Sequence, residues 1–305
     1  MELLYALEAI RTPFLDKLMT FFSFIGGETF FFALGIIVLW CINKKCGFYI
    51  MTVGFTGTII SQFLKLWFRI PRPWVKDPDF TILESARAEA TGYSFPSGHT
   101  VNAFATYGAP ATYTKKKLLK VILYLIIPAI AFSRMYAGVH TPLDVGVSLG
   151  IGLIFMFILY PLFRDMDERP DQVYMLFLLF IIAAIAFVLF VELYAFPADV
   201  DPVNLAEGAK SAYMILFCSF GLLLVFHLDR TRIHYVTEAV WWAQIIKVAI
   251  GLSVTLGLKA ALKAPLLAMF NGHAVAHGIR YFIMILFAGI LWPLTFKWFS
   301  KLGRK

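Results

Sequence analysis

Apolar stretches long enough to cross a bilayer recur along this chain of 305 residues, and they limit what it can fold into. A membrane-spanning helix needs about 20 predominantly apolar residues. Here 60% of the residues are hydrophobic and only 15% are charged, whereas ordinary soluble domains carry about 25% charged residues. The sequence therefore predicts an all-α, polytopic integral membrane bundle. We expect about nine transmembrane helices, at residues 27–44, 48–68, 97–113, 119–137, 143–163, 173–194, 211–228, 237–262 and 278–300.

Two segments need separate interpretation. Residues 1–26 lack the basic start and the unbroken apolar run of a signal peptide, and they favour an amphipathic helix that lies in the membrane interface. The stretch 97–113 is short and contains Thr, Asn, Gly and Pro. Such a helix survives in a membrane only when neighbouring helices shield it, so we expect this one inside the bundle.

The net charge of +8 indicates membrane orientation and does not predict a nucleic-acid partner. Basic residues are denser in one of the two alternating sets of loops. That side should be cytoplasmic, which puts the N-terminus outside and the C-terminus inside. The three cysteines form neither a disulfide framework nor a zinc site. The basic residues of the inner side are Lys44, Lys45, Lys115, Lys116, Lys117, Lys120, Arg164, Arg169, Arg230, Arg232, Lys297, Lys301, Arg304 and Lys305.

Three polar clusters reach the opposite, extracytoplasmic side in this topology. The first is KLWFRIPRP at 65–73, the second is SFPSGHT at 94–100, and the third is SRMYAGVHTPLD at 133–144. Three permanent cations in them are enough to hold a phosphoryl group, and the helix start in the second cluster adds free N–H groups. The predicted phosphate-binding residues are Lys65, Arg72, Ser97, Gly98 and Arg134.

The third cluster also carries a pattern typical of nucleophilic catalysis. Thr141 is the expected N-cap of a helix whose first turn contains Asp144. His140 and Asp144 are four residues apart, so the carboxylate can orient the imidazole if the helical turn extends back to His140. His99, from another helix, can protonate a leaving oxygen. A capping pair without catalytic work is the alternative for His140 and Asp144.

At these residues the chain closely resembles the type 2 phosphatidic acid phosphatase superfamily, which is related to the acid phosphatases and vanadium haloperoxidases. The resemblance implies a metal-independent phosphatase without a cofactor that works through a phosphohistidine. It implies that His140 is the nucleophile, Asp144 its orienting partner and His99 the general acid. The matching positions are Lys65-x6-Arg72-Pro73, Pro96-Ser97-Gly98-His99 and Ser133-Arg134-x5-His140-x3-Asp144.

The predicted organisation has three parts: an interfacial helix at 1–26, a catalytic core at 27–165, and C-terminal transmembrane helices of unknown role at 166–305. The loop 69–96 is long for a structureless connection, and long loops are often functional. Its Glu84, Arg87 and Glu89 form either a solvated face or a lid.

We expect a phosphorylated lipid as the substrate, of phospholipid or polyprenyl type, because the site lies where helix ends meet the outer edge of the bilayer. The expected location is the plasma membrane, with the site on its extracytoplasmic side. Three alternatives stay open: a lipid phosphotransferase of the same fold, a sugar-phosphate phosphatase, and a non-enzymatic lipid transporter. The sequence does not predict an oligomeric state.

Overall fold

The computed structural model describes residues 1–303, so Arg304 and Lys305 of the predicted inner side lie outside the described residues. The described residues form helices and turns without any strand, which confirms the all-α prediction. The first half contains α1 (Glu2–Ala9), α2 (Pro13–Ile25), α3 (Glu28–Cys41), α4 (Lys44–Phe68), α5 (Pro73–Lys76), α6 (Glu84–Arg87), α7 (Gly98–Ala103), η1 (Phe104–Gly108), α8 (Ala109–Tyr113), α9 (Lys117–Tyr136) and α10 (Pro142–Arg164). The second half contains α11 (Pro170–Leu193), α12 (Pro202–Leu228), η2 (Asp229–Ile233), α13 (Trp241–Ala261), α14 (Lys263–Met269), α15 (Val275–Leu286), η3 (Phe287–Leu291), η4 (Pro293–Thr295) and α16 (Phe296–Phe299).

Among residues 1–303, seven helical segments are long and apolar enough to cross a membrane. The count becomes eight if α2 and α3, which meet at an angle of 51°, form one bent span. The integral-membrane prediction is therefore confirmed, while the count of nine is not. The seven segments are Lys44–Lys76, Lys117–Tyr136, Pro142–Arg164, Pro170–Leu193, Pro202–Ile233, Trp241–Met269 and Val275–Phe299.

The N-terminal region differs from the single helix that we expected at 1–26. It forms α1 and α2, separated by a break at residues 10–12. The hydroxyl of Thr12 accepts a hydrogen bond from the N–H of Leu15, and Pro13 occupies the first helical position. An N-cap followed by proline starts a new helix, so the local sequence explains the break.

The weak stretch at 97–113 forms three short consecutive pieces, α7, η1 and α8. Its middle piece is a π-helical turn in which all five residues are buried. This burial confirms the expectation that the stretch lies inside the protein. It also explains how a helix with Gly and Pro is stabilised, because neighbouring side chains shield its backbone.

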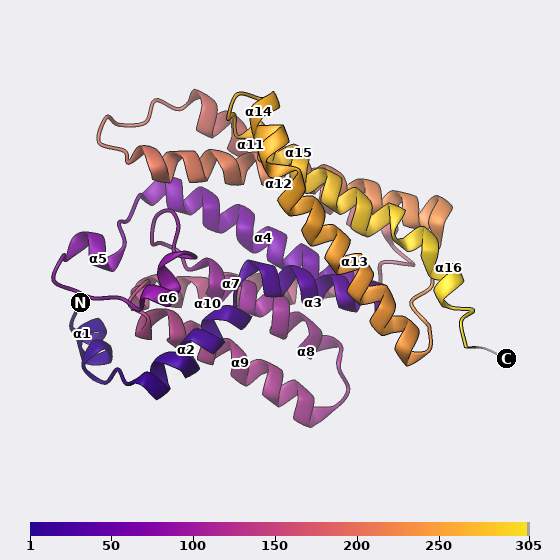
Figure 1. The fold of residues 1–305 in the computed structure, drawn as a ribbon, viewed down its shortest axis with the longest axis horizontal. Helices are drawn as coiled ribbons and strands as arrows, with labels where there is room; N and C mark the ends of the chain where they lie inside the picture. Colours follow the sequence, from indigo (N-terminus) through magenta and orange to yellow (C-terminus); the bar gives the residue numbers. More distant parts are fainter. Residues whose placement is uncertain (304–305) are drawn as a thin grey trace. The chain divides into compact units, whose positions relative to one another are not determined.

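The chain divides into two compact units that alternate along the sequence. The first comprises residues 1–34, 49–161 and 196–208. Within it α9 packs against α2 and α7, as Figure 1 shows. The side chain of Tyr49 donates a hydrogen bond to the carbonyl of Met156, which ties α4 to α10. All three polar clusters lie in this unit.

The second unit comprises residues 35–48, 162–195 and those from 209 onward. Its interior contains Lys247, whose ammonium donates to the carbonyls of Trp40 at 3.0 Å and Thr237 at 3.3 Å. The indole N–H of Trp40 donates to the carbonyl of Ala288 at 2.8 Å. A charge inside a membrane bundle needs such hydrogen-bond partners. These contacts also connect α3, α13 and η3.

In the first unit, the N-terminal helices hold the loop 69–96 in place. Arg11 donates to the carbonyls of Tyr136 and Thr81, each at 3.0 Å. Leu4 of α1 packs in a buried cluster with Phe80 and Ile82 of the loop. The loop is thus fixed by hydrogen bonds and apolar contacts near the end of α9, where the third polar cluster lies.

Candidate active site

The three polar clusters converge in the first unit. Arg72 follows α4, and its Nη1 lies 3.1 Å from Nε2 of His140 in the loop between α9 and α10. The N–H of Ser97, just before α7, donates to the backbone carbonyl of Asp144 at 3.3 Å. Direct contacts therefore connect the first cluster to the third and the second cluster to the third.

The contact between Arg72 and His140 determines the tautomer of the imidazole. A guanidinium can only donate hydrogen bonds, so Nε2 of His140 accepts and carries the lone pair. The proton of the neutral ring then resides on Nδ1, which lies 3.5 Å from Oδ2 of Asp144. An imidazole in this state has its unprotonated nitrogen available for attack and its N–H directed toward the carboxylate.

Asp144 and Thr141 form a reciprocal pair of hydrogen bonds at the start of α10. Oδ2 of Asp144 accepts from the N–H of Thr141 at 2.7 Å, and the N–H of Asp144 donates to the Thr141 hydroxyl at 3.3 Å. This reciprocal pair is a capping box that starts α10. The predicted N-cap role of Thr141 is confirmed.

The hydrogen bond that could join His140 to Asp144 is not formed, and Nδ1 of His140 lies 3.5 Å from Oδ2 of Asp144. The helix begins at Pro142, so the turn does not extend back to His140. Nδ1 of His140 and Oδ1 of Asp144 are buried and have no hydrogen-bond partner in the protein. Catalytic hydrogen bonds are often long without substrate, and the 3.5 Å separation leaves the pair able to close.

Ser94 is a site residue that the sequence analysis missed. Its buried hydroxyl donates to Oδ2 of Asp144 at 2.6 Å. Ser94 opens the second cluster but precedes the motif Pro96-Ser97-Gly98-His99, so only its position in space distinguishes it. Together with Thr141 it holds the carboxylate that faces His140.

The three predicted cations are buried, but they are not equally free to bind a ligand. Arg72 donates to the carbonyls of Gly92 at 3.0 Å, Val139 at 2.9 Å and Thr91 at 2.8 Å. Lys65 donates to the carbonyl of Tyr93. These carbonyls hold the two side chains in place and satisfy part of their donor capacity.

Arg134 keeps the largest unsatisfied donor capacity of the three. It is fully buried, and its Nη1 donates to the hydroxyl of Ser23 in α2. Its Nε and Nη2 have no hydrogen-bond partner among residues 1–303. Buried guanidinium donors need an acceptor, and two oxygens of a phosphoryl group suit the planar fork of N–H donors.

His140 lies in the electrostatic field of the other site residues. Burial is the main cause that holds its pKa well below 6.5, and Arg72, Lys65, Arg134 and His99 lower it further. The imidazole is therefore neutral at pH 7. His99 and the three cations therefore lie close enough to His140 to influence its charge.

His99 has a partner from the long loop. Its Nε2 lies 2.8 Å from Oε2 of Glu89, and its side chain is 13% exposed. The hydrogen bond to His99 lowers the pKa of Glu89 below 4.5. Glu89 thus belongs to the site, whereas Glu84 and Arg87 form an exposed ion pair of the kind expected for a solvated face.

Ser97 and Gly98 border the site in different ways. The buried hydroxyl of Ser97 accepts a hydrogen bond from Thr100 at 3.0 Å. A Cβ placed on Gly98 would meet no atom within 4 Å, so open space adjoins this backbone. No group of three or more His, Cys, Asp or Glu among residues 1–303 is arranged to hold a metal ion.

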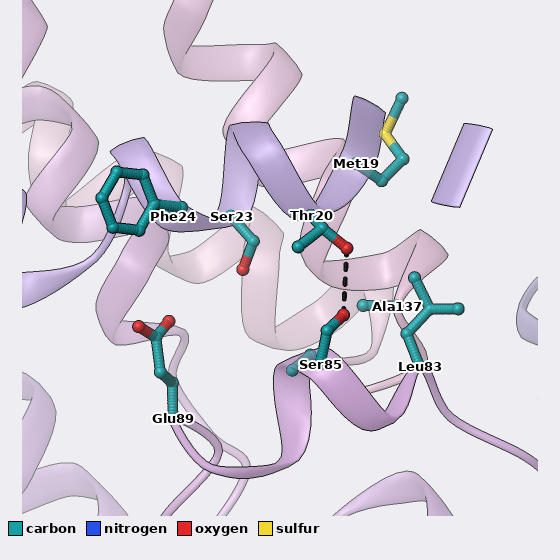
Figure 2. Close-up of a pocket in the computed structure, with 9 residues that line it drawn as sticks. Met19, Thr20, Ser23, Phe24, Leu83, Ser85, Glu89 and Ala137 are labelled. Carbon is teal, nitrogen blue, oxygen red and sulfur yellow. Dashed lines mark hydrogen bonds between the residues drawn. The ribbon is translucent and has the colours of Figure 1, made fainter. Parts of the chain in front are cut away.

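A cavity of about 120 Å³ lies between α2 and α6. Figure 2 shows the hydroxyls of Thr20 and Ser85 joined by a hydrogen bond of 2.9 Å, with the Glu89 carboxylate at the side of the cavity. Two lining residues contact site residues directly, because Ser23 accepts from Arg134 and Glu89 bonds to His99. The lining residues are Met19, Thr20, Ser23, Phe24, Leu83, Ser85, Ala86, Glu89 and Ala137.

Comparisons with known proteins find relatives for both halves of the chain. The family model of the PAP2 superfamily matches residues 44–168, which contain all three clusters. A second model, for the transmembrane extension of PAP2 superfamily phosphatases, matches residues 213–305. The C-terminal helices, for which the sequence suggested no relative, thus match a described extension.

Individual relatives match about half of this chain. Phosphatidylglycerophosphatase B of Bacillus subtilis is 31% identical over 162 residues, which are 48% of this chain and 75% of that protein. Undecaprenyl-diphosphatase BcrC of Bacillus subtilis is 29% identical over 150 residues, 48% of this chain and 74% of that protein. The crystal structure of Aquifex aeolicus LpxE is 32% identical, with a TM-score of 0.46, and covers 52% of this chain and 92% of that one.

Proposed function

This chain belongs to the PAP2 superfamily, and on that premise we propose that it is an integral-membrane phosphatase that hydrolyses the phosphomonoester or pyrophosphate of a lipid. The names of its relatives support this class, since one is a phosphatidylglycerophosphatase and another an undecaprenyl-diphosphatase. The substrate is of phospholipid or polyprenyl type.

One observation carries the proposal. Three buried cations, Lys65, Arg72 and Arg134, lie within electrostatic range of a neutral imidazole, and the carboxylates of Asp144 and Glu89 leave the group with a net positive charge. Arg134 in addition holds two donors without a partner. Buried charge of this kind is unfavourable unless a ligand neutralises it, and a phosphate dianion supplies the missing negative charge.

In the first step, the lone pair on Nε2 of His140 attacks the phosphorus of the substrate. A P–N bond forms while the P–O bond to the lipid alcohol breaks. The leaving oxygen takes a proton from His99, which becomes protonated when the phosphate dianion binds, because the phosphate and Glu89 together stabilise the imidazolium. Lys65, Arg72 and Arg134 bind the phosphoryl oxygens together with Ser97 and the backbone of Gly98.

In the second step, water attacks the phosphorus and transfers a proton to His99. The P–N bond breaks, its electron pair returns to His140, and inorganic phosphate leaves. Asp144 holds the Nδ1–H of His140 throughout and stabilises the positive charge on the ring in the phosphohistidine. No metal ion or cofactor takes part, so EDTA should leave the activity intact and vanadate, which resembles a pentacoordinate phosphoryl group, should inhibit it.

We place the site on the extracytoplasmic side of the plasma membrane. Nine spans result if the α2–α3 pair and the buried α7–η1–α8 segment each cross the membrane in addition to the seven long helical segments, and we propose this topology. The denser basic loops then face the cytoplasm. We also propose that residues 1–26 lie in the membrane interface.

The test measures phosphate release by the purified protein from a panel of substrates. The panel contains phosphatidic acid, phosphatidylglycerophosphate, undecaprenyl diphosphate, sphingosine phosphate and glucose 6-phosphate. We expect release from at least one lipid, loss of release in His140→Ala, and retention in Lys17→Ala, which changes an exposed residue outside the site. Efficient cleavage of glucose 6-phosphate with no cleavage of any lipid would contradict the proposal.

A further inference from the structure

We infer that the cavity between α2 and α6 receives the leaving group of the substrate, and that its lining selects an uncharged alcohol over a second phosphate. This inference rests on the phosphatase function proposed above and narrows its substrate to phosphomonoesters. The cavity has a volume of about 120 Å³ and lies entirely within the first unit.

Two hydrogen bonds connect residues that line the cavity to the proposed catalytic site. Ser23 lines it and accepts a hydrogen bond from Arg134, the cation with free donors for the phosphoryl group. Glu89 lines it and bonds at 2.8 Å to His99, the proposed donor of a proton to the leaving oxygen. Arg134 and His99, which act on either side of the breaking P–O bond, are thus each one hydrogen bond away from a residue that lines this space.

The polar part of the lining suits hydroxyl groups. Thr20, Ser23 and Ser85 contribute hydroxyls that can both donate and accept, and Glu89 contributes an acceptor. Figure 2 shows these four side chains around the cavity, with Thr20 and Ser85 bonded to each other. A leaving alcohol with further hydroxyl groups, as in a glycerol headgroup, would exchange bonds with them.

A second phosphate has no counter-charge in the same place. The lining contains no Lys or Arg, and its one charged side chain is the Glu89 carboxylate, whose lowered pKa keeps it ionised at neutral pH. Like charges placed together at a binding surface reject a ligand effectively. A diphosphate would set its distal phosphate against this carboxylate.

The apolar part of the lining suits the beginning of a lipid chain. Met19, Phe24 and Leu83 line the cavity beside the hydroxyl groups, and Phe24 is an exposed aromatic side chain at the end of α2. A lipid alcohol has the same division between a polar head and an apolar tail. A small soluble sugar offers no group for this apolar part.

The bond changes of the first step favour a phosphomonoester over a diphosphate. With a monoester, the P–O bond breaks and the leaving oxygen accepts the proton of His99, which yields a neutral alcohol beside Glu89. With a diphosphate, the same bond change leaves a phosphate monoester that still carries negative charge after it accepts the proton. That product would be repelled by Glu89 in the cavity.

The experiment compares two lipids with identical acyl chains, dioleoyl phosphatidic acid and dioleoylglycerol diphosphate, in mixed micelles. We expect the wild-type protein to have a kcat/KM for the monoester at least about tenfold higher than for the diphosphate. Glu89→Gln removes the charge and should reduce this ratio by about tenfold, even where both rates fall. Ser85→Lys adds a cation to the lining and should also reduce the ratio.

Glu84→Gln is the matched control, because Glu84 lies in the same loop but pairs with the exposed Arg87. It should leave the ratio at the wild-type value. A wild-type ratio at or below one would overturn the inference, as would unchanged ratios in both Glu89→Gln and Ser85→Lys, since a purely positioning role for Glu89 slows both lipids equally. Hydrolysis of neither lipid, nor of any other in the panel, would overturn the phosphatase function itself and this inference with it.

Discussion

Ser94 donates a 2.6 Å hydrogen bond to the same carboxylate oxygen of Asp144 that lies 3.5 Å from Nδ1 of His140. Thr141 donates its N–H to that oxygen as well. Two short hydrogen bonds thus fix the carboxylate before any substrate binds. The third contact, to His140, is the longest of the set and is the one that the reaction would shorten.

Ser94→Ala should lower kcat about tenfold while KM changes little, because the carboxylate loses one of the two donors that aim it at His140. The matched control is Ser148→Ala. Ser148 is also buried and also bonds to Asp144, but through the backbone carbonyl at 2.7 Å. Steady-state kinetics on one lipid substrate checks the prediction, and equal losses in the two variants would contradict it.

The pH dependence of kcat/KM should follow the lowered pKa of His140. Burial, followed by the nearby cations, holds this pKa well below 6.5. The folded protein therefore keeps the neutral, nucleophilic imidazole as the pH falls through 6.5, and the His140-dependent decline in kcat/KM begins only at more acidic pH. Arg72→Gln removes a lowering interaction, so it should move this acidic limb toward higher pH.

The measurement is a pH profile of kcat/KM for the wild type and for Arg72→Gln with the same substrate. Ionisation of the substrate is common to both profiles and cancels in their difference. An acidic limb that stays in place or moves toward lower pH in Arg72→Gln would contradict the assignment of that limb to His140.

Gly98→Ala should reduce kcat/KM by at least about tenfold without destabilising the protein. A Cβ at Gly98 meets no atom within 4 Å in the protein itself, so the substitution is accommodated. The space that it fills is where we place the phosphoryl oxygens. The substitution should therefore lower kcat/KM while the stability of the protein without substrate stays the same.

Gly150→Ala is the control for Gly98→Ala, since a Cβ there also meets nothing within 4 Å and Gly150 lies inside α10. Thermal unfolding in detergent should give similar midpoints for both variants and the wild type. Full activity of Gly98→Ala would show that the substrate does not approach this backbone.

Arg11→Gln should loosen the loop 69–96. It removes charge-assisted hydrogen bonds to Tyr136 and Thr81, each worth about 1.5–3 kcal/mol in folded proteins. We expect faster hydrogen exchange in residues 77–83 and a lower kcat, because this loop carries Glu89. Lys17→Gln, at an exposed position of α2, is the control and should exchange like the wild type.

Much of the general architecture followed from hydropathy alone. Long apolar runs in a chain with few charges must become helices in a bilayer, because lipid cannot satisfy an open backbone. The spacing of the three motifs likewise predicted candidate site residues, and the structure places Arg72 against His140 and Ser97 against Asp144.

Other features were not predictable in that way. The π-helical turn of η1 and the site contacts of Ser23 and Ser94 depend on packing between segments distant in sequence. A serine or glutamate in a polar loop has no periodicity that marks it.

By itself the sequence determined the membrane class and the types and spacing of the reactive groups, because hydropathy and short-range spacing are local properties of the chain. Only the tertiary structure decided which groups share a hydrogen bond. Ser94 and Asp144 are 50 residues apart, and their 2.6 Å contact exists because the loop after α4 packs against the start of α10. Hydrogen bonds depend on distances of a few tenths of an ångström, and those distances are set by packing of the whole unit.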